Sequence, residues 1–171
     1  RRMLMTMSVQ TQAIRALVYA AVAEADRASL GLAGAKERLD LLTPLAKAHG
    51  TDIGCEVASL GVQVHGGMGF IEEAGAAQHY RDARIAPIYE GTNGIQAADL
   101  VGRKLARDGG VAMRSLVAEI RAEAQSDGLL TLVRDVDVAT ATLLEMDVDD
   151  RLAASAPYLT LVLVMVCGWL M

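Results

Sequence analysis

The feature that most constrains the fold of this chain is a helical period that recurs along its length. Apolar residues return at the i, i+3, i+4 and i+7 spacing of one helix face, as in Ile14, Leu17, Val18 and Ala21. No stretch alternates apolar and polar residues in the way that a half-buried strand does. Alanine, leucine and valine dominate the hydrophobic residues, which make up 53% of the chain, and alanine and leucine favour helices most. We therefore expect an all-α, up-and-down antiparallel helix bundle with a further carboxy-terminal helical extension.

Glycines and prolines set the helix ends that we expect in the first half of the chain. Gly31–Gly34 breaks the first helix, and the second should run over Pro44–His65, because proline suits the first turn of a helix. A short helix follows around Ala74–Asp82. Thr92 can cap the next helix, whose body is Ile95–Ala106.

The character of the sequence changes after Asp108-Gly109-Gly110. One helix should carry Leu116 to Ala124 and close at Asp127-Gly128, another should cover Leu129–Leu144, and the last should cover Leu152–Leu170. We therefore divide the chain into a helical bundle over residues 1–108 and a helical extension over 109–171. Both ends of the chain lie inside helical patterns, so we expect a piece of a longer protein whose extension is truncated.

Charge and cysteine content narrow the possible partners. A net charge of -5 argues against a nucleic-acid partner, which normally meets a basic patch. Two cysteines, Cys55 and Cys167, are too few for a disulfide framework or a metal cluster, so we expect buried free thiols in a reducing cytoplasm.

The apolar run Pro157–Met171 is shorter than the roughly 20 residues of a spanning helix, which favours a buried helix. A membrane-associated bundle stays open on this run alone.

The residues that can carry chemistry lie between Gln63 and Gln96, and each has an ordinary structural explanation. Gly66-Gly67-Met68-Gly69 can end a helix and form a turn. Arg81, Asp82 and Arg84 can form surface ion pairs, which contribute little to stability. Glu90 can be a solvated turn residue.

Taken together, these residues resemble the carboxy-terminal signature of the acyl-CoA dehydrogenase family. That signature has a glutamine, a double glycine, and then glycine with an aromatic residue; it continues with Arg-Asp-x-Arg-Ile, then Tyr-Glu-Gly-Thr and a further glutamine. The matching positions here are Gln63, Gly66, Gly67, Gly69, Phe70, Arg81 to Ile85, Tyr89 to Thr92, and Gln96. The resemblance covers about residues 10–107.

The resemblance implies roles for individual residues. Glu90 takes the position of the family's catalytic base, and Gly91 lies against the acyl-CoA substrate. Two segments match flavin contacts: one touches the adenosine-pyrophosphate part of an FAD held mainly by a neighbouring subunit, and the other forms a second contact. These cofactor-binding residues are Gln63, Val64, His65, Gly66 and Gly67 in the first segment, and Thr92, Asn93 and Gly94 in the second. The family often has serine in place of Asn93.

The implied reaction is the α,β-desaturation of an acyl-CoA thioester, as in the β-oxidation of fatty acids. A carboxylate can remove the α-proton when an apolar pocket raises its pKa towards neutrality, and Ile85–Tyr89 form an apolar approach to Glu90. Hydride acceptance belongs to FAD. The resemblance also implies a homo-oligomer, a dimer or tetramer with FAD at a subunit interface, and electron-transfer flavoprotein as the electron acceptor.

The chain departs from the family in two ways. The amino-terminal helical domain, the middle β-domain and an arginine that helps to bind FAD have no counterpart, so we expect an incomplete flavin site and an inactive fragment. The extension past residue 108 resembles long bacterial members, which include dehydrogenases of 3-methylthiopropanoyl-CoA. One alternative is that specificity, and another is a non-enzymatic helical assembly module. The intact Glu90 disfavours the latter.

Overall fold

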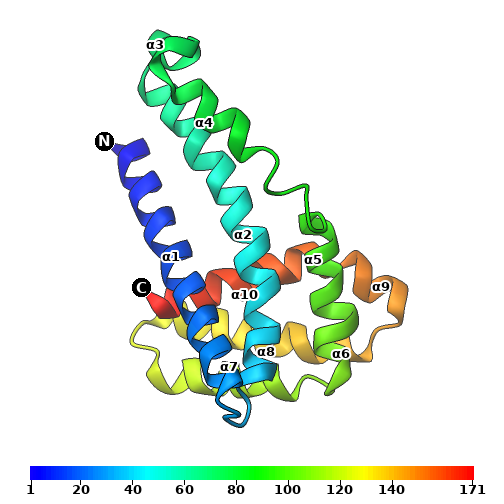
Figure 1. The fold of residues 1–171 in the computed structure, drawn as a ribbon. Coiled ribbons are helices and arrows are strands. Elements are labelled where there is room, and N and C mark those ends of the chain that lie inside the picture. Colours follow the sequence, from blue (N-terminus) through cyan, green and yellow to red (C-terminus); the bar gives the residue numbers. More distant parts are fainter.

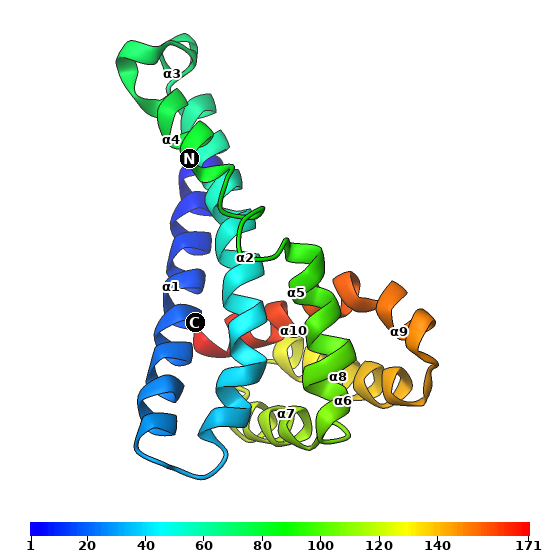
Figure 2. The same cartoon turned by 45° about the vertical axis from the view of Figure 1, so that its right-hand side comes forward.

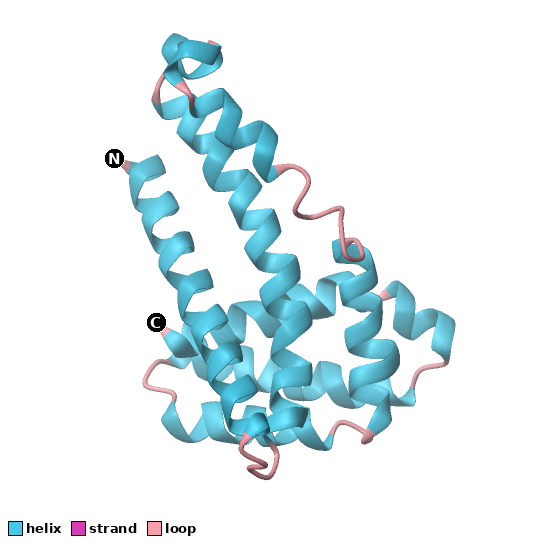
Figure 3. Cartoon of the chain, viewed as in Figure 1, coloured by secondary structure: helices cyan, strands magenta, loops and turns pink.

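The computed structural model describes residues 1–171 and contains helices and connecting turns only, so the all-α prediction is confirmed (Figure 3). Its longest elements are α1 (Arg2–Ser29) and α2 (Ala35–Val64), which form an antiparallel pair joined by the turn around Gly31 and Gly34. Both glycines have positive φ, 72° and 79°, which explains why the expected break falls there.

Past α2 the chain turns back along the helix that it has just completed. The short elements α3 (Gly67–Phe70) and η1 (Glu72–Ala74) form a tip beyond the end of α2, and α4 (Ala76–Ala83) packs beside α2 (Figure 1). The connection that follows leads to α5 (Asn93–Asp99), which continues through the π-helical turn η2 (Leu100–Lys104) into α6 (Leu105–Arg107). The expected helices near 74–82 and 95–106 are therefore present.

The extension lies across the α1–α2 pair. It consists of α7 (Val111–Glu123), α8 (Asp127–Glu145), α9 (Val148–Ala153) and α10 (Ser155–Leu170). In Figure 1, α7, α8 and α10 run crosswise behind the lower half of α1 and α2. The apolar run that ends the chain forms α10, whose buried residues include Val162, Met165 and Val166. No helix of the structure has the length and apolar character that crossing a membrane requires.

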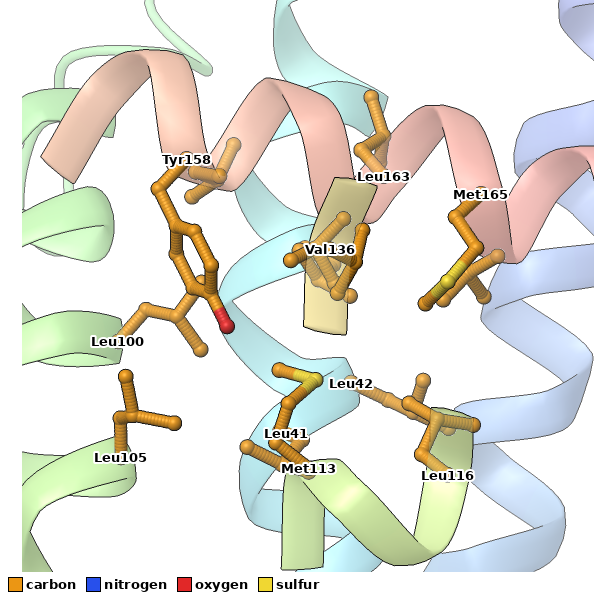
Figure 4. Close-up of a cluster of buried hydrophobic side chains, with 14 of the residues drawn as sticks. Leu41, Leu42, Leu100, Leu105, Met113, Leu116, Val136, Tyr158, Leu163 and Met165 are labelled. Atoms are coloured by element: carbon orange, nitrogen blue, oxygen red, sulfur yellow. The ribbon is translucent and has the colours of Figure 1, made fainter. Parts of the chain in front are cut away.

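One hydrophobic core connects the first half of the chain to the extension. Its 24 buried residues come from α1, α2, α5–α6, α7, α8 and α10. Figure 4 labels ten of them: Leu41, Leu42, Leu100, Leu105, Met113, Leu116, Val136, Tyr158, Leu163 and Met165. The division at residue 108 coincides with the turn Asp108–Gly110, and it remains a prediction. Whatever the division, both parts bury their apolar faces in the same core.

The second helix begins nine residues earlier than expected, at Ala35, and Pro44 lies inside it. A proline in a helix interior costs about 3 kcal/mol, because it removes a hydrogen bond and crowds the preceding turn. Leu41, Leu42 and Leu45 are buried in the core on either side of it. Burial of these leucines offsets the cost of the proline, so tertiary packing prevails over the local signal.

Two helix ends in the extension also differ from expectation. Asp127-Gly128 opens α8 instead of closing α7, since the Ser126 hydroxyl accepts a hydrogen bond from Leu129 N at 3.2 Å and caps the new helix. The helix expected over Leu152–Leu170 is divided at Ala154 into α9 and α10. Pro157 lies in the first turn of α10, where its missing N–H loses no helical bond.

Candidate functional site

The end of α2 and the tip present the first predicted flavin segment to solvent. Gln63 and Val64 are the last exposed residues of α2, and the ring Nδ1 of His65 lies 2.8 Å from the carbonyl oxygen of Gly61. Gly66 has φ 61° and ψ −140°, a conformation that only glycine adopts readily. The exposed stretch from Gln63 to Gly67 is thus held at a sharp turn at the far end of the long helix.

The two glycines on either side of Met68 have different reasons to be glycine. Gly69 is buried, and a Cβ placed on it would lie 2.2 Å from the carbonyl oxygen of Val62, so the packing of α3 on α2 requires it. A Cβ on Gly67 would meet nothing within 4 Å, and Gly67 has a negative φ. The fold by itself gives no steric reason for glycine at position 67, whose backbone faces open space.

Arg81 fastens the tip to α4. Its guanidinium donates two hydrogen bonds to the Glu72 carboxylate, both 2.6 Å long, which raises the pKa of Arg81. The sequence suggested a surface ion pair for Arg81, and the pair is present, although its partner belongs to η1. An open cavity of about 580 Å³ lies beside this pair, lined by Val62, Phe70, Ile71, Glu72, Glu73, Ala77, Tyr80 and Arg81.

Glu90 has a backbone conformation shared by no other non-glycine residue of the chain. Its φ is 56°, and that of the following Gly91 is 86°. A left-handed conformation costs a non-glycine residue about 1–2 kcal/mol, so other contacts must hold the segment in place. The Glu90 carboxylate is exposed and takes part in none of the hydrogen bonds or ion pairs of the structure.

The apolar approach expected before Glu90 does not form a pocket within this chain. Ile85, Ile88 and Tyr89 are 59%, 55% and 51% exposed, because the connection from α4 to α5 runs over the surface. The Glu90 carboxylate is therefore presented on an open apolar surface. Any enclosed pocket around it needs walls from outside these 171 residues.

The segment after Glu90 is fastened to the middle of α2 by polar side chains. The Lys47 ammonium donates to the carbonyl oxygen of Gly91 at 2.7 Å and to Asn93 Oδ1 at 3.1 Å. The Asn93 amide nitrogen in turn lies within hydrogen-bond distance of the Ala48 carbonyl oxygen, Thr51 Oγ1 and Asp52 Oδ1, at 3.1, 3.1 and 2.7 Å. The side chain of Asn93, predicted as a flavin contact, is thus occupied within the chain.

The neighbours of Asn93 complete the turn into α5. The Thr92 hydroxyl caps this helix as expected, by accepting a hydrogen bond from Ile95 N at 3.4 Å. Gly94 is exposed in its first turn. Backbone and side chains at residues 91–93 are therefore ordered by contacts with α2 and with α5 itself.

Sequence reasoning missed Lys47, since a lone lysine on a helix is usually solvated. The nearest signal is that residues 47, 48, 51 and 52 follow the i, i+1, i+4, i+5 spacing of one helix face, and three of them are polar. The same helix carries other polar residues, such as Glu37 and Glu56, so this pattern does not single out a partner, which proves to be the segment after Glu90.

The two predicted flavin segments do not meet in one chain. Asn93 lies against Thr51, whereas Gln63 is 12 residues further along α2, which corresponds to about 18 Å along the helix axis at 1.5 Å per residue. Figure 2 shows the tip and the start of α5 well apart. A cavity of about 640 Å³ between the α1–α2 turn and α7 contains none of the predicted site residues.

Comparisons with known proteins agree with the sequence signature. A model of the family described as "Acyl-CoA dehydrogenase, C-terminal domain" matches residues 1–106. The chain is 53% identical over 126 residues to 3-methylmercaptopropionyl-CoA dehydrogenase of Ruegeria pomeroyi, a match that covers 71% of this chain and 21% of that protein. It is 34% identical over 127 residues to the broad-specificity linear acyl-CoA dehydrogenase of Mycobacterium tuberculosis, covering 71% of this chain and 21% of that protein.

The fold of the whole chain, extension included, recurs in a solved structure. The apo form of Bd2924 superposes with a TM-score of 0.83 at 20% identity, covering 98% of this chain and 32% of that one. The chain spans about a fifth of the length of the curated relatives. The match of the family model over more than half of the residues is decisive: this chain belongs to the acyl-CoA dehydrogenase family and carries its carboxy-terminal helical domain.

Proposed function

We propose that this chain is the carboxy-terminal part of an FAD-dependent acyl-CoA dehydrogenase and that Glu90 removes the α-proton of the acyl-CoA thioester. The observation that carries the proposal is the presentation of Glu90: a carboxylate without a partner in the chain, at a left-handed residue whose next peptide is fastened to α2. Other carboxylates of the chain have structural partners: Asp108 accepts hydrogen bonds from backbone amides at the start of α7, and Asp40 pairs with Lys104.

The chain's residues support the proton transfer in distinct ways. The Glu90 carboxylate accepts the α-proton on one of its oxygens, and Gly91 leaves room for the thioester beside it because it has no side chain. The exposed residues Ile85, Ile88 and Tyr89 offer apolar surface to the acyl chain. Closure of this surface by the rest of the protein would exclude water and create the apolar surroundings that a carboxylate base requires.

The residues present also fit the flavin contacts that the family implies. Gly67 is open to solvent with no steric need to be glycine, so its backbone N–H can approach a pyrophosphate closely. FAD, when bound, supplies the hydride acceptor for the β-carbon. Gln63, Val64, His65, Gly66 and Gly67 would hold one flavin, and Thr92, Asn93 and Gly94 would contact another through their backbone and the Thr92 hydroxyl.

The separation of these two segments along α2 favours a homo-oligomer, a dimer or tetramer, in which each flavin lies between subunits. We propose a cytoplasmic enzyme with electron-transfer flavoprotein as its electron acceptor. The isolated chain should be inactive, because each of its flavin segments reaches only part of a cofactor and nothing in the chain encloses Glu90.

A second, narrower proposal concerns the substrate. The identity of 53% to the 3-methylmercaptopropionyl-CoA dehydrogenase of Ruegeria pomeroyi compares with 34% to a butyryl-CoA dehydrogenase of Syntrophomonas wolfei over a similar span. This difference favours 3-methylmercaptopropionyl-CoA as the substrate of the full-length enzyme. Comparing kcat/KM for that thioester and for butyryl-CoA would decide, and a preference for butyryl-CoA would exclude the narrower proposal.

Substitution of Glu90 in the full-length enzyme tests the main proposal. Glu90→Gln keeps the shape of the side chain but removes the base, so it should retain the yellow flavin absorbance and lose at least about 99% of turnover. Glu145→Gln is the matched control, since Glu145 is also exposed and lies at the end of α8. Turnover of Glu90→Gln within a few-fold of wild type would remove Glu90 from the mechanism.

A further inference from the structure

Lys47 is the one charged side chain that reaches the backbone next to Glu90. It lies on α2, 43 residues earlier in the chain, and is half-buried beneath the Glu90–Asn93 segment. Two of its three possible hydrogen bonds are made to this segment, to Gly91 O at 2.7 Å and to Asn93 Oδ1 at 3.1 Å. A half-buried ammonium loses much of its water, so its bonds to these oxygens are costly to break.

The segment needs such an attachment on its carboxyl side. Glu90 and Gly91 are consecutive residues with positive φ, and the Glu90 side chain makes no bond that would hold its own backbone there. The carbonyl of Gly91 is the first backbone atom after Glu90 that is bonded to another element. Its bond to Lys47 fixes the peptide plane on which the direction of the Glu90 side chain depends.

We infer that Lys47 is a positioning residue for the base: its bond to the Gly91 carbonyl holds Glu90 in the left-handed conformation that aims the carboxylate at the substrate. This inference rests on the proposed role of Glu90. It assigns no contact between Lys47 and the substrate, and Lys47 acts only through the Gly91 peptide. Misplacement of a catalytic group by about 1 Å can cost roughly a hundredfold in rate.

The test is Lys47→Met in the full-length, FAD-loaded enzyme, which removes the donors and keeps an unbranched apolar stem of similar length. Rapid mixing with 3-methylmercaptopropionyl-CoA, and with butyryl-CoA as a second substrate, gives the first-order rate constant of flavin bleaching. This rate constant does not depend on the fraction of enzyme that is folded, so a merely structural role leaves it unchanged. We expect it to fall at least tenfold at saturating thioester while the flavin content stays near that of wild type.

Lys36→Met provides the matched control, because Lys36 lies on the same helix, is exposed and bonds nothing; it should match wild type. A bleaching rate constant of Lys47→Met within twofold of this control would overturn the inference, while an inactive Glu90→Gln would still support the proposed function. Near-normal turnover of Glu90→Gln, a variant that retains Lys47, would instead refute the proposed function. The inference about Lys47 would then fall with it.

A second variant keeps the inference testable if Lys47→Met does not fold with flavin. Lys47→Arg keeps the charge and the donors but places them on a longer planar group, which cannot occupy the position of Nζ. The bleaching rate constant should then fall several-fold with flavin retained. An unchanged rate constant in Lys47→Arg would show that the position of this ammonium group does not matter, and would overturn the inference.

Discussion

Met165→Ala tests whether the extension and the family domain unfold as one unit. Met165 lies on α10, is 0% exposed, and belongs to the same buried cluster as Leu17 of α1 and Leu45 of α2. Since this cluster spans both sides of residue 108, a cavity made in the extension should weaken the whole chain. Two separate cores would confine the effect to the extension.

The expected loss of stability follows from the atoms removed. Truncation beyond Cβ takes away the γ, δ and ε atoms of a fully buried side chain, which is about 2.4 kcal/mol at about 0.8 kcal/mol for each methylene-sized group. The residual cavity adds to this, and buried methionine-to-alanine changes cost about 2–5 kcal/mol in total. With a urea slope of about 2 kcal/mol/M, the midpoint of unfolding should fall by about 1–2.5 M.

Two probes followed in the same urea titration make the test sharp. Far-ultraviolet circular dichroism reports all helices, whereas fluorescence reports Trp169, the only tryptophan, at the end of α10. Both transitions should coincide in wild type and shift together in Met165→Ala. Met5→Ala, at a methionine that is 66% exposed on α1, should shift neither by more than about 0.5 kcal/mol. A fluorescence midpoint that moves alone would refute the single core.

Three further predictions concern titration, the tip and the cofactor. Burial raises the pKa of Tyr158 to about 12, although its hydrogen bond to Thr140 acts in the opposite direction. The native state therefore keeps a proton that the unfolded tyrosine releases above its ordinary pKa of 10.0, and the free energy of unfolding should fall as pH rises from about 10 to about 12. Urea midpoints should show that Tyr158→Phe loses less stability over this range than wild type. Gly69→Ala should distort the tip, because its Cβ meets Val62 O at 2.2 Å. A Cβ on Gly67 meets nothing within 4 Å, so Gly67→Ala should leave the melting temperature near wild type while weakening FAD retention in the full-length enzyme. Equal FAD retention in wild type and Gly67→Ala would count against a close flavin approach at this residue. In equilibrium dialysis the isolated chain should not retain FAD stoichiometrically at micromolar concentration, because half a site loses most contacts yet bears the full entropy of association; stoichiometric retention would show a complete site.

The sequence alone determined the class of the fold and the family. Helical periodicity and helix-favouring composition are local properties, and they indicated all-α structure without any knowledge of packing. The spacing from Gln63 through Glu90 to Gln96 is equally local, which is why the signature could be recognised directly. Caps such as Thr92 were predictable for the same reason, since a capping hydroxyl acts on residues three positions away.

Only the tertiary structure decided where some helices begin and what holds the segment around Glu90. Pro44 lies inside α2 because buried leucines, contributed to a core shared with other helices, outweigh the local cost of proline. Likewise, the bond from Lys47 to the Gly91 carbonyl joins residues 44 positions apart, and it exists only because the chain turns back along α2 through α4. Contacts between residues that are distant in the sequence, and the energies that depend on them, cannot be obtained from the local pattern. For the same reason the sequence could not predict that Glu90 is exposed on an open surface within this chain.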